Sequence, residues 1–267
     1  MTTQLSEGTA AVQGPLWSER ADDWATLHEH NLTPVYGAVL DLLRAGPGVS
    51  ILEVGCGGGT ALALAADRGA AVSALDAAAA FVEITRKRVP NADVRVGDLQ
   101  FLPYEEASFD AVMGFNAFQY AAEPLAALAE ARRVLRPGGR VAIMVWGPQE
   151  ECEIATHLAA LRPFMPPPPP DTPGPFALSQ PGALRALVSE AGFEVDIVAD
   201  ASGPFVYPTE EIALRGLMSG GPVINIVRRV GDKVVADAIR DAVAEYRQPD
   251  GSYRFENTWR FAVATKP

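Results

Sequence analysis

The sequence is poor in cysteine and histidine and has no strongly basic stretch. It contains two cysteines and three histidines among 267 residues, too few for a disulfide framework or a cysteine-rich metal cluster. We therefore expect a reduced, cytoplasmic protein without a bound metal. The formal net charge of −11 would repel phosphate backbones. This charge disfavours nucleic acid as a partner.

Long apolar runs are also missing. No stretch reaches the roughly 18 residues that suggest a membrane-spanning helix, and residues 1–14 lack the hydrophobic core of a signal peptide. The sequence predicts neither membrane insertion nor secretion. Hydrophobic residues nevertheless make up 48% of the chain, which is enough for one large core, with or without a modest accessory layer.

Between residues 49 and 146, short apolar runs alternate with longer helix-compatible stretches. This pattern predicts an α/β fold in which helices cover both faces of a parallel sheet. The expected strands are Ser50 to Val54, Ala71 to Leu75, Asp93 to Val96, Phe109 to Phe115 and Arg140 to Trp146. The expected helices are Thr60 to Arg68, Ala78 to Val89 and Pro124 to Leu135.

The alternation breaks after Gly147. We expect a helix at 150–161 and then a rigid, proline-rich connector around Pro166 to Pro170, although such a run is also typical of a partner-binding motif. A helix at 181–191, a strand at 193–199, helical insertions from 208 to 247 and a last strand at 253–264 should follow. The predicted organisation is a lid and core at 1–147, a proline-rich insertion at 148–180, continued core at 181–206, a helical cap at 207–250 and a final strand at 251–267.

The most informative motif is an apolar strand that runs into a glycine-rich turn, Ile51 to Gly59, before an alanine-rich helix. Glycines at such a turn let the backbone approach a bound molecule closely. Because ligands bind at the carboxyl ends of the strands in a doubly wound sheet, Asp76 and Asp98 should lie at the same edge. A competing interpretation is that both aspartates only cap helices.

The acidic character of this edge separates two ligand classes. A dinucleotide carries a pyrophosphate that needs donors and cations, whereas a sulfonium nucleoside is positively charged. The dinucleotide fingerprint also requires a third glycine where this chain has Thr60. A nicotinamide-dependent oxidoreductase is therefore the weaker alternative.

Several motifs together resemble the class I S-adenosylmethionine-dependent methyltransferases, especially the branch of ubiquinone and menaquinone C-methyltransferases and related small-molecule enzymes. The similarity extends from about Trp17 to Trp146. It consists of LEVGCGGG at 52–59, Leu75-Asp76, the block at 97–110 and the LRPGG turn at 135–139. The resemblance implies a seven-stranded sheet whose last strand is antiparallel, with helical cap insertions, and S-adenosylmethionine as cofactor with S-adenosylhomocysteine as product.

The resemblance also implies a set of cofactor contacts in the lid helix and at the strand tips. In chain order they are Trp24, Glu53, Gly55, Cys56, Gly57, Asp76, Ala77, Asp98, Leu99, Phe115 and Asn116. The glycine turn would hold the methionine moiety, with Glu53 bracing it. Asp76 would accept the ribose hydroxyls, the pair 98–99 would recognise the adenine amine, and the pair 115–116 would meet the ammonium group.

The leading segment should form one helix over this edge, with Trp17, Ala21 and Trp24 on one face. His28 lies four residues after Trp24, so it is the first candidate for a general base, against the alternative of a surface histidine. Gln119 and Tyr120 follow the fourth strand and are candidates to orient the acceptor, although core packing explains Tyr120 as well.

The lid and the two insertions should converge above the methyl group. Their apolar residues would then form a chamber for a small, largely apolar acceptor. These residues are Phe164, Met165, Phe176, Phe205, Tyr207, Leu217 and Met218. The sequence thus predicts transfer of a methyl group to an oxygen, nitrogen or carbon atom of a small molecule by a monomer or homodimer. A methyltransferase-like scaffold with altered or lost chemistry is the alternative.

Overall fold

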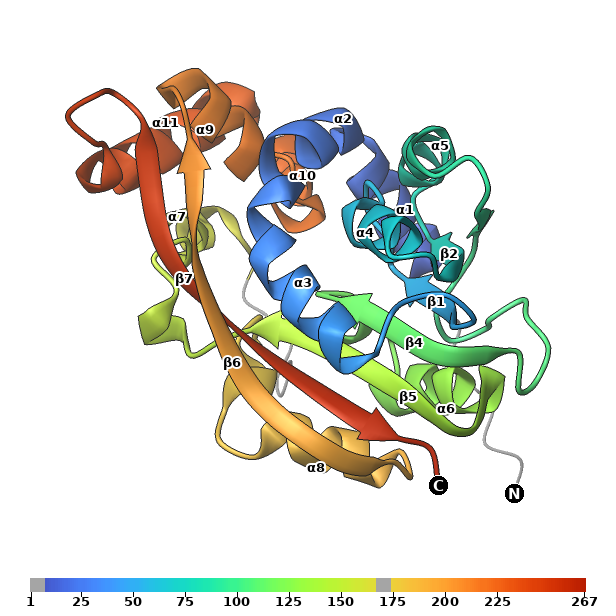
Figure 1. Cartoon of the computed structure of the whole chain (residues 1–267). Helices are drawn as coiled ribbons and strands as arrows, with labels where there is room; N and C mark the ends of the chain where they lie inside the picture. Colours follow the sequence, from blue (N-terminus) through green and yellow to red (C-terminus); the bar gives the residue numbers. More distant parts are fainter. Residues whose placement is uncertain (1–7, 167–173) are drawn as a thin grey trace.

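The computed structural model describes residues 8–166 and 174–267, and it contains one seven-stranded sheet of order β3-β2-β1-β4-β5-β7-β6 (Figure 1). Most of the proline run, from 167 onward, lies outside the described residues. Strand β7 is antiparallel to both of its neighbours, and the pairs among β1 to β5 are parallel. The strands are β1 (Ser50–Val54), β2 (Ala71–Asp76), β3 (Asp93–Val96), β4 (Phe109–Phe115), β5 (Leu135–Trp146), β6 (Glu194–Tyr207) and β7 (Tyr253–Thr265).

The predicted seven strands and the antiparallel last strand are confirmed. The prediction for β6 was too short, because this strand continues from Ala199 to Tyr207 in register with β7. Beyond Trp146, where β5 ends, β6 and β7 continue as a two-stranded arm. Alternating burial along the distal part of β6 fits a ribbon with one face against the rest of the molecule.

Helices cover both faces of the sheet, as expected: α3, α4 and α5 lie on one face, and α6 and α8 lie on the other (Figure 1). Prolines at the first turns of α3 and α6 fix the helical φ without losing a needed donor. The α-helices are α1 (Ala10–Ser18), α2 (Ala21–Asp23), α3 (Thr33–Leu42), α4 (Thr60–Asp67), α5 (Ala79–Arg88), α6 (Pro124–Val134), α7 (Ala155–Leu161), α8 (Ala183–Glu190), α9 (Glu210–Leu217), α10 (Gly221–Val230) and α11 (Asp232–Val243).

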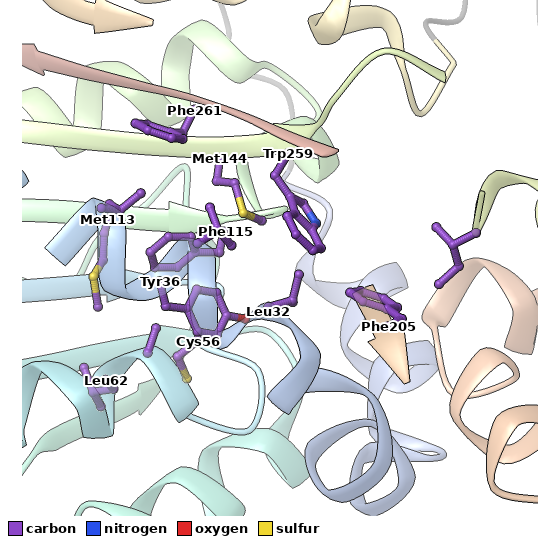
Figure 2. Packing of buried hydrophobic residues seen from close by; sticks show 14 of the residues in the cluster. Leu32, Tyr36, Cys56, Leu62, Met113, Phe115, Met144, Phe205, Trp259 and Phe261 are labelled. Carbon is purple, nitrogen blue, oxygen red and sulfur yellow. The ribbon is translucent and has the colours of Figure 1, made fainter. Parts of the chain in front are cut away.

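The core is divided by the sheet into two layers. The larger layer extends under α3 and α4 and continues without a break to the cap, as Figure 2 shows for Tyr36, Met144, Trp259 and Phe205. The smaller layer packs β4 and β5 against α6 and α8. Because one apolar cluster joins the sheet to the cap, the cap is a continuation of the core.

Two helix predictions were wrong in detail. The helix expected at 150–161 begins at Ala155, after a short 3-10 turn, Gln149–Glu151. The single leading helix is broken, because α1 ends at Ser18, α2 is one turn and a π-helical segment, η1 (Trp24–His28), follows. Trp17 and Trp24 still meet, edge to face, with ring centroids 5.0 Å apart.

The lid, defined as residues 8–32, and the cap, residues 208–252, converge at the carboxyl edge of the sheet as predicted. Ion pairs join them: Arg228 contacts Glu19 at 2.7 Å, and Arg215 contacts Asp23 at 2.6 Å. The apolar faces of α10 and α11 are buried. This burial shows that the cap helices face the core.

Candidate active site

The glycine turn after β1 is a cradle with no room for side chains. Gly55 and Gly57 both have positive φ, 71° and 53°, which L-residues rarely adopt. A Cβ on Gly55 would lie 2.6 Å from the Cβ of Ala117, and one on Gly57 would lie 3.4 Å from Nε1 of Trp24. The turn therefore packs closely between the tip of β4 and the lid, and no side chain of its own separates its backbone from these neighbours.

Asp76 lies at the tip of β2, where the sequence placed it, and its carboxylate organises the turn. Its Oδ2 accepts a hydrogen bond from the Gly57 amide at 2.9 Å, and its Oδ1 accepts one from Ala78 at 2.8 Å. The side chain is buried, and burial raises the pKa of Asp76 to about 6. The bond to Ala78 resembles the expected helix cap, but the bond to Gly57 ties the same carboxylate to the cradle.

Glu53 is a buried residue of β1, and one oxygen of its carboxyl group has no partner within the described part of the chain. Its Oε2 is shielded from solvent and has no hydrogen-bond partner among the described residues. Burial raises the pKa of Glu53 well above its ordinary value, and the negative charges of Glu29 and Asp76 raise it further. An orphaned acid beside a bare turn fits a ligand that brings donors or positive charge.

The tip of β3 is covered by the lid. Asp98 accepts hydrogen bonds from the backbone of Gln100 at 2.9 Å and of Ala10 at 2.8 Å. A Cβ on Gly14 would collide with the carbonyl oxygen of Ala77. Helix α1 thus lies on the two positions, Ala77 and Asp98, that the resemblance assigns to adenine. An adenine must share these positions with α1 or displace it.

The tip of β4 supplies an amide pair. Asn116 has φ 50°, and its Oδ1 accepts a hydrogen bond from Nε2 of Gln119 at 3.0 Å. Oε1 of Gln119 is buried and has no partner among the described residues. The ring of Phe115 packs on Tyr36 in the core, with centroids 4.5 Å apart, so only its backbone is available to a ligand.

Three further candidates are placed as follows. Leu99 is half-buried and packs against the smaller core layer. Tyr120 packs edge to face on Trp17, with centroids 5.6 Å apart, and burial raises its pKa to about 12. The Cys56 thiol points to the hydroxyl of Thr85 at 3.7 Å, and burial raises its pKa, so it is an unreactive core group.

His28 is buried at the junction of lid and cap. Its Nδ1 shares a hydrogen bond of 2.9 Å with the Tyr207 hydroxyl, and its ring stacks on Trp24 with centroids 4.4 Å apart. Burial, reinforced by His157 and His30, lowers the pKa of His28 to about 3. The imidazole is therefore neutral at physiological pH. It sits in a π-helical segment, a geometry that is frequent at functional sites.

Several of the residues expected to line an apolar chamber lie together in the packed core. Phe205, Tyr207, Leu217 and Met218 are buried in the continuous core layer at this edge. Phe164 and Phe176 are half-buried, and Phe164 packs on the same layer. The prediction that Met165 belongs to this apolar group was wrong, because its side chain is 48% exposed. It lies after the 3-10 turn that ends α7, where the chain leaves the core.

Sequence reasoning missed a polar cluster that joins lid and cradle. Glu29 is buried, and its Oε2 accepts hydrogen bonds from Thr60 at 2.8 Å and from Arg88 at 3.2 Å. The stretch around Glu29 is polar in sequence and carries no signal of burial. Only Thr60 gave a hint, as the residue that departs from the dinucleotide fingerprint.

Two surface hollows lie away from this edge. One, of about 420 Å³, is lined by α8, β6 and Arg260, and the other, of about 540 Å³, lies beside α6. No residue of the glycine turn or of the lid lines either hollow. Within the described ranges, none of the helices has the length and hydropathy needed to cross a membrane.

Comparison with known proteins agrees with this geometry. Residues 52–143 match a family described as a methyltransferase domain. An O-methyltransferase of Pyrenophora dematioidea is 30% identical over 200 residues, which are 72% of each chain. A demethylmenaquinone methyltransferase of Renibacterium salmoninarum is 38% identical over 105 residues, 39% of this chain and 44% of that protein. The chain spans 32% to 57% of the length of several curated relatives.

The fold is also similar to that of solved structures. The [4+2]-cyclase SpnF superimposes with a TM-score of 0.60 at 20% identity, covering 97% of this chain and 93% of that one. At this identity the similarity concerns the fold alone. Fold, motifs and relatives together define a Rossmann-like enzyme of the transferase class. The chain belongs to the class I S-adenosylmethionine-dependent methyltransferases.

Proposed function

We propose that this chain transfers a methyl group from S-adenosylmethionine to an oxygen, nitrogen or carbon atom of a small, largely apolar molecule. The observation that carries the proposal is the bare turn at Gly55 and Gly57, which lies beside two buried carboxyls, Glu53 and Asp76. A site with excess acid and no side chain on the turn favours a cationic nucleoside over a pyrophosphate.

In this proposal, the residues at the strand tips bind different parts of the donor. The cradle and Glu53 would hold the methionine moiety, Asp76 the ribose hydroxyls, and Asp98 with Leu99 the adenine. When bound, the donor supplies an electrophilic methyl group on a positively charged sulfur. The chain aligns the two reactants and excludes water. Alignment alone is worth about 7–11 kcal/mol in well-oriented reactions.

The acceptor would lie between lid and cap, beside the aromatic rings of Phe205 and Tyr207. Trp146 adds another aromatic wall, with its ring centroid 6.0 Å from that of Phe205. These surfaces suit an apolar molecule with few polar atoms. The net charge of −11 supports a small molecule over nucleic acid. We propose that the enzyme acts in the cytoplasm as a monomer or homodimer.

His28, Gln119 and Tyr120 are the proposed residues for the acceptor side. The orphaned Oε1 of Gln119 suits a hydrogen bond from an acceptor hydroxyl or amine. His28 is neutral, and in the tautomer in which its Nδ1–H donates to the Tyr207 hydroxyl, Nε2 can accept a proton or a hydrogen bond. Because its pKa is about 3, it is a weak base, and we expect a modest contribution below the typical range of about 10²–10⁴-fold.

Mass spectrometry of small molecules released from the purified protein tests the donor. S-adenosylmethionine or S-adenosylhomocysteine in the extract supports the proposal, and a nicotinamide dinucleotide contradicts it. Incubation with methyl-labelled donor and a panel of apolar phenols, quinones and amines then tests the acceptor. Tight donor binding without transfer to any panel member would favour a scaffold that has lost methyl transfer.

A further inference from the structure

Glu29 places a lid carboxylate directly against the cradle. A Cβ on Gly58 would lie 2.5 Å from its Oε2, and one on Gly57 would lie 3.0 Å from its Oε1. The indole nitrogen of Trp24 lies over the same side of Gly57. Glu29 is 3% exposed, so this close approach takes place in a desolvated setting.

Acidic groups outnumber basic groups around Glu29. Glu29, Glu53 and Asp76 are all buried around the turn. Arg88 forms an ion pair with Glu29 at 3.2 Å, and no ion pair of the described residues involves Glu53 or Asp76. Burial raises the pKa of all three carboxyls, and the charge of Glu29 raises that of Glu53 further. A positive charge beside these carboxyls would favour their ionised forms, so a cluster of three acids and one guanidinium suits a cationic ligand.

We propose that Glu29 is a specificity-determining residue of the donor site, a lid carboxylate that favours the positively charged donor over the product with its neutral sulfur. This inference rests on the proposed function and adds to it a means of product release. The donor carries one positive charge more than the product. A buried carboxylate beside the turn stabilises that charge, so methyl transfer itself weakens the attraction between ligand and lid.

A purely mechanical role does not account for this arrangement. Arg88 already fastens the lid to the turn through backbone oxygens, at 2.6 Å from that of Gly58 and 3.3 Å from that of Ala25. A neutral amide at position 29 could accept the same hydrogen bonds from Thr60 and Arg88 without the desolvation cost of a carboxylate, and it would lose only the charge of the ion pair. Oε2 of Glu53 has no hydrogen-bond partner in the part of the chain that the structure describes, which independently indicates that this cluster binds a ligand with a donor group or a positive charge.

Calorimetric binding of S-adenosylmethionine and S-adenosylhomocysteine to the wild type and to Glu29→Gln tests the proposal. Glutamine keeps the size and hydrogen bonds of the side chain and removes its charge. We expect donor affinity to fall about tenfold or more and product affinity to fall less than threefold. Equal losses for both ligands, or no loss, would overturn the proposal.

The matched control is Glu19→Gln, because Glu19 is also a lid carboxylate paired with an arginine, Arg228 at 2.7 Å. A lid that is merely loosened should affect both variants alike, whereas we expect the control to keep the wild-type ratio of affinities. If the wild type binds neither ligand, the proposed function fails. If it binds both and Glu29→Gln leaves the ratio unchanged, only this inference fails.

A measurement on the wild type keeps the test independent of how the variant folds. The pKa of Glu29 is raised to about 7 and that of Asp76 to about 6, so binding of a cation should release protons at pH 7. Glu53, Tyr36 and Arg88 face the same cluster. Calorimetry in buffers of different ionisation enthalpy should show more proton release with the donor than with the product. Equal release would contradict the proposal.

Discussion

Gly14 lies so close to Ala77 that a β-carbon on the glycine would collide with the alanine carbonyl oxygen. The contact joins α1 to the turn after β2. A second contact, the hydrogen bond from the Ala10 amide to Asp98, joins the same helix to the tip of β3. Helix α1 therefore rests on the backbone of Ala77 and on the carboxylate of Asp98, and its position depends on the missing side chain of Gly14.

Gly14→Leu should unseat α1. The leucine side chain has no space against backbone that cannot move aside, so we expect the amides of residues 10–18 to exchange hydrogen at least about tenfold faster. Hydrogen-exchange mass spectrometry measures this change. Val12→Leu is the control, because Val12 is 64% exposed on the same helix and should keep wild-type protection. Equal protection in both variants would show that α1 is not held through Gly14.

Asp76→Ala should weaken binding of the methyl donor. It removes the acceptor for the Gly57 amide and the expected charge-assisted bonds to the ribose, each worth about 1.5–3 kcal/mol. We expect affinity to fall about tenfold or more by calorimetry. Asp41→Ala, which removes an exposed ion pair with Arg68, should stay within about twofold of the wild type. An unchanged affinity in Asp76→Ala would remove Asp76 from the donor site.

The free energy of unfolding should respond to the buried acid Glu29. Its folded-state pKa is about 7, against an ordinary value of 4.5, so the folded protein holds this proton more tightly than the unfolded chain does. The resulting stability is fully present below pH 4.5 and is lost as pH rises through about 7, by about 3 kcal/mol. Glu29→Gln does not titrate at this position.

Urea denaturation at pH 5 and at pH 7.5 measures the effect. We expect the wild type to lose more stability than Glu29→Gln between the two values. The lowered pKa values of His28 and His157 act in the opposite direction, because folding keeps these rings neutral. Both histidines are present in each protein, so their contribution cancels in the comparison. Parallel pH profiles would mean that Glu29 is ionised in the folded protein.

Tyr207→Phe should destabilise the junction of lid and cap. The change leaves the buried Nδ1 of His28 without its partner, which costs about 1–3 kcal/mol. Tyr246→Phe is the matched control, since its hydroxyl bonds to Thr156 at 3.0 Å in a half-buried setting and should cost less than about 1 kcal/mol. Urea denaturation compares the two variants. A similar loss of stability in both variants would mean that the hydrogen bond between Tyr207 and His28 contributes no more than an ordinary half-buried hydrogen bond.

The sequence predicted the part of the fold from β1 to β4 closely. Strands β1 to β4 and the helices between them depend on local patterns, such as the apolar run before Gly55 and the proline that starts α6. Asp76 was found because spacing along the chain fixes which strand tip it occupies. These features are local, so periodicity and turn chemistry are sufficient to find them.

The lid and the cap were less predictable, because their contacts join residues far apart in sequence. The bond from Tyr207 to His28 and the approach of Glu29 to Gly58 depend on how three segments pack. Nothing in the polar stretch around Glu29 distinguishes a buried acid from a solvated one. The exposure of Met165 likewise follows from where α7 ends, which composition does not reveal.

The distal halves of β6 and β7 form an arm, and the chain segment that connects these two strands contains the cap helices (Figure 1). An insertion or deletion at its tip leaves every register along β1 to β5 intact, because the strands enter and leave the sheet at the same place. Variation in residues 208–252 can therefore change the surface that the cap presents to the lid without changing the sheet. If the proposed acceptor lies there, one chemical step can serve different acceptors.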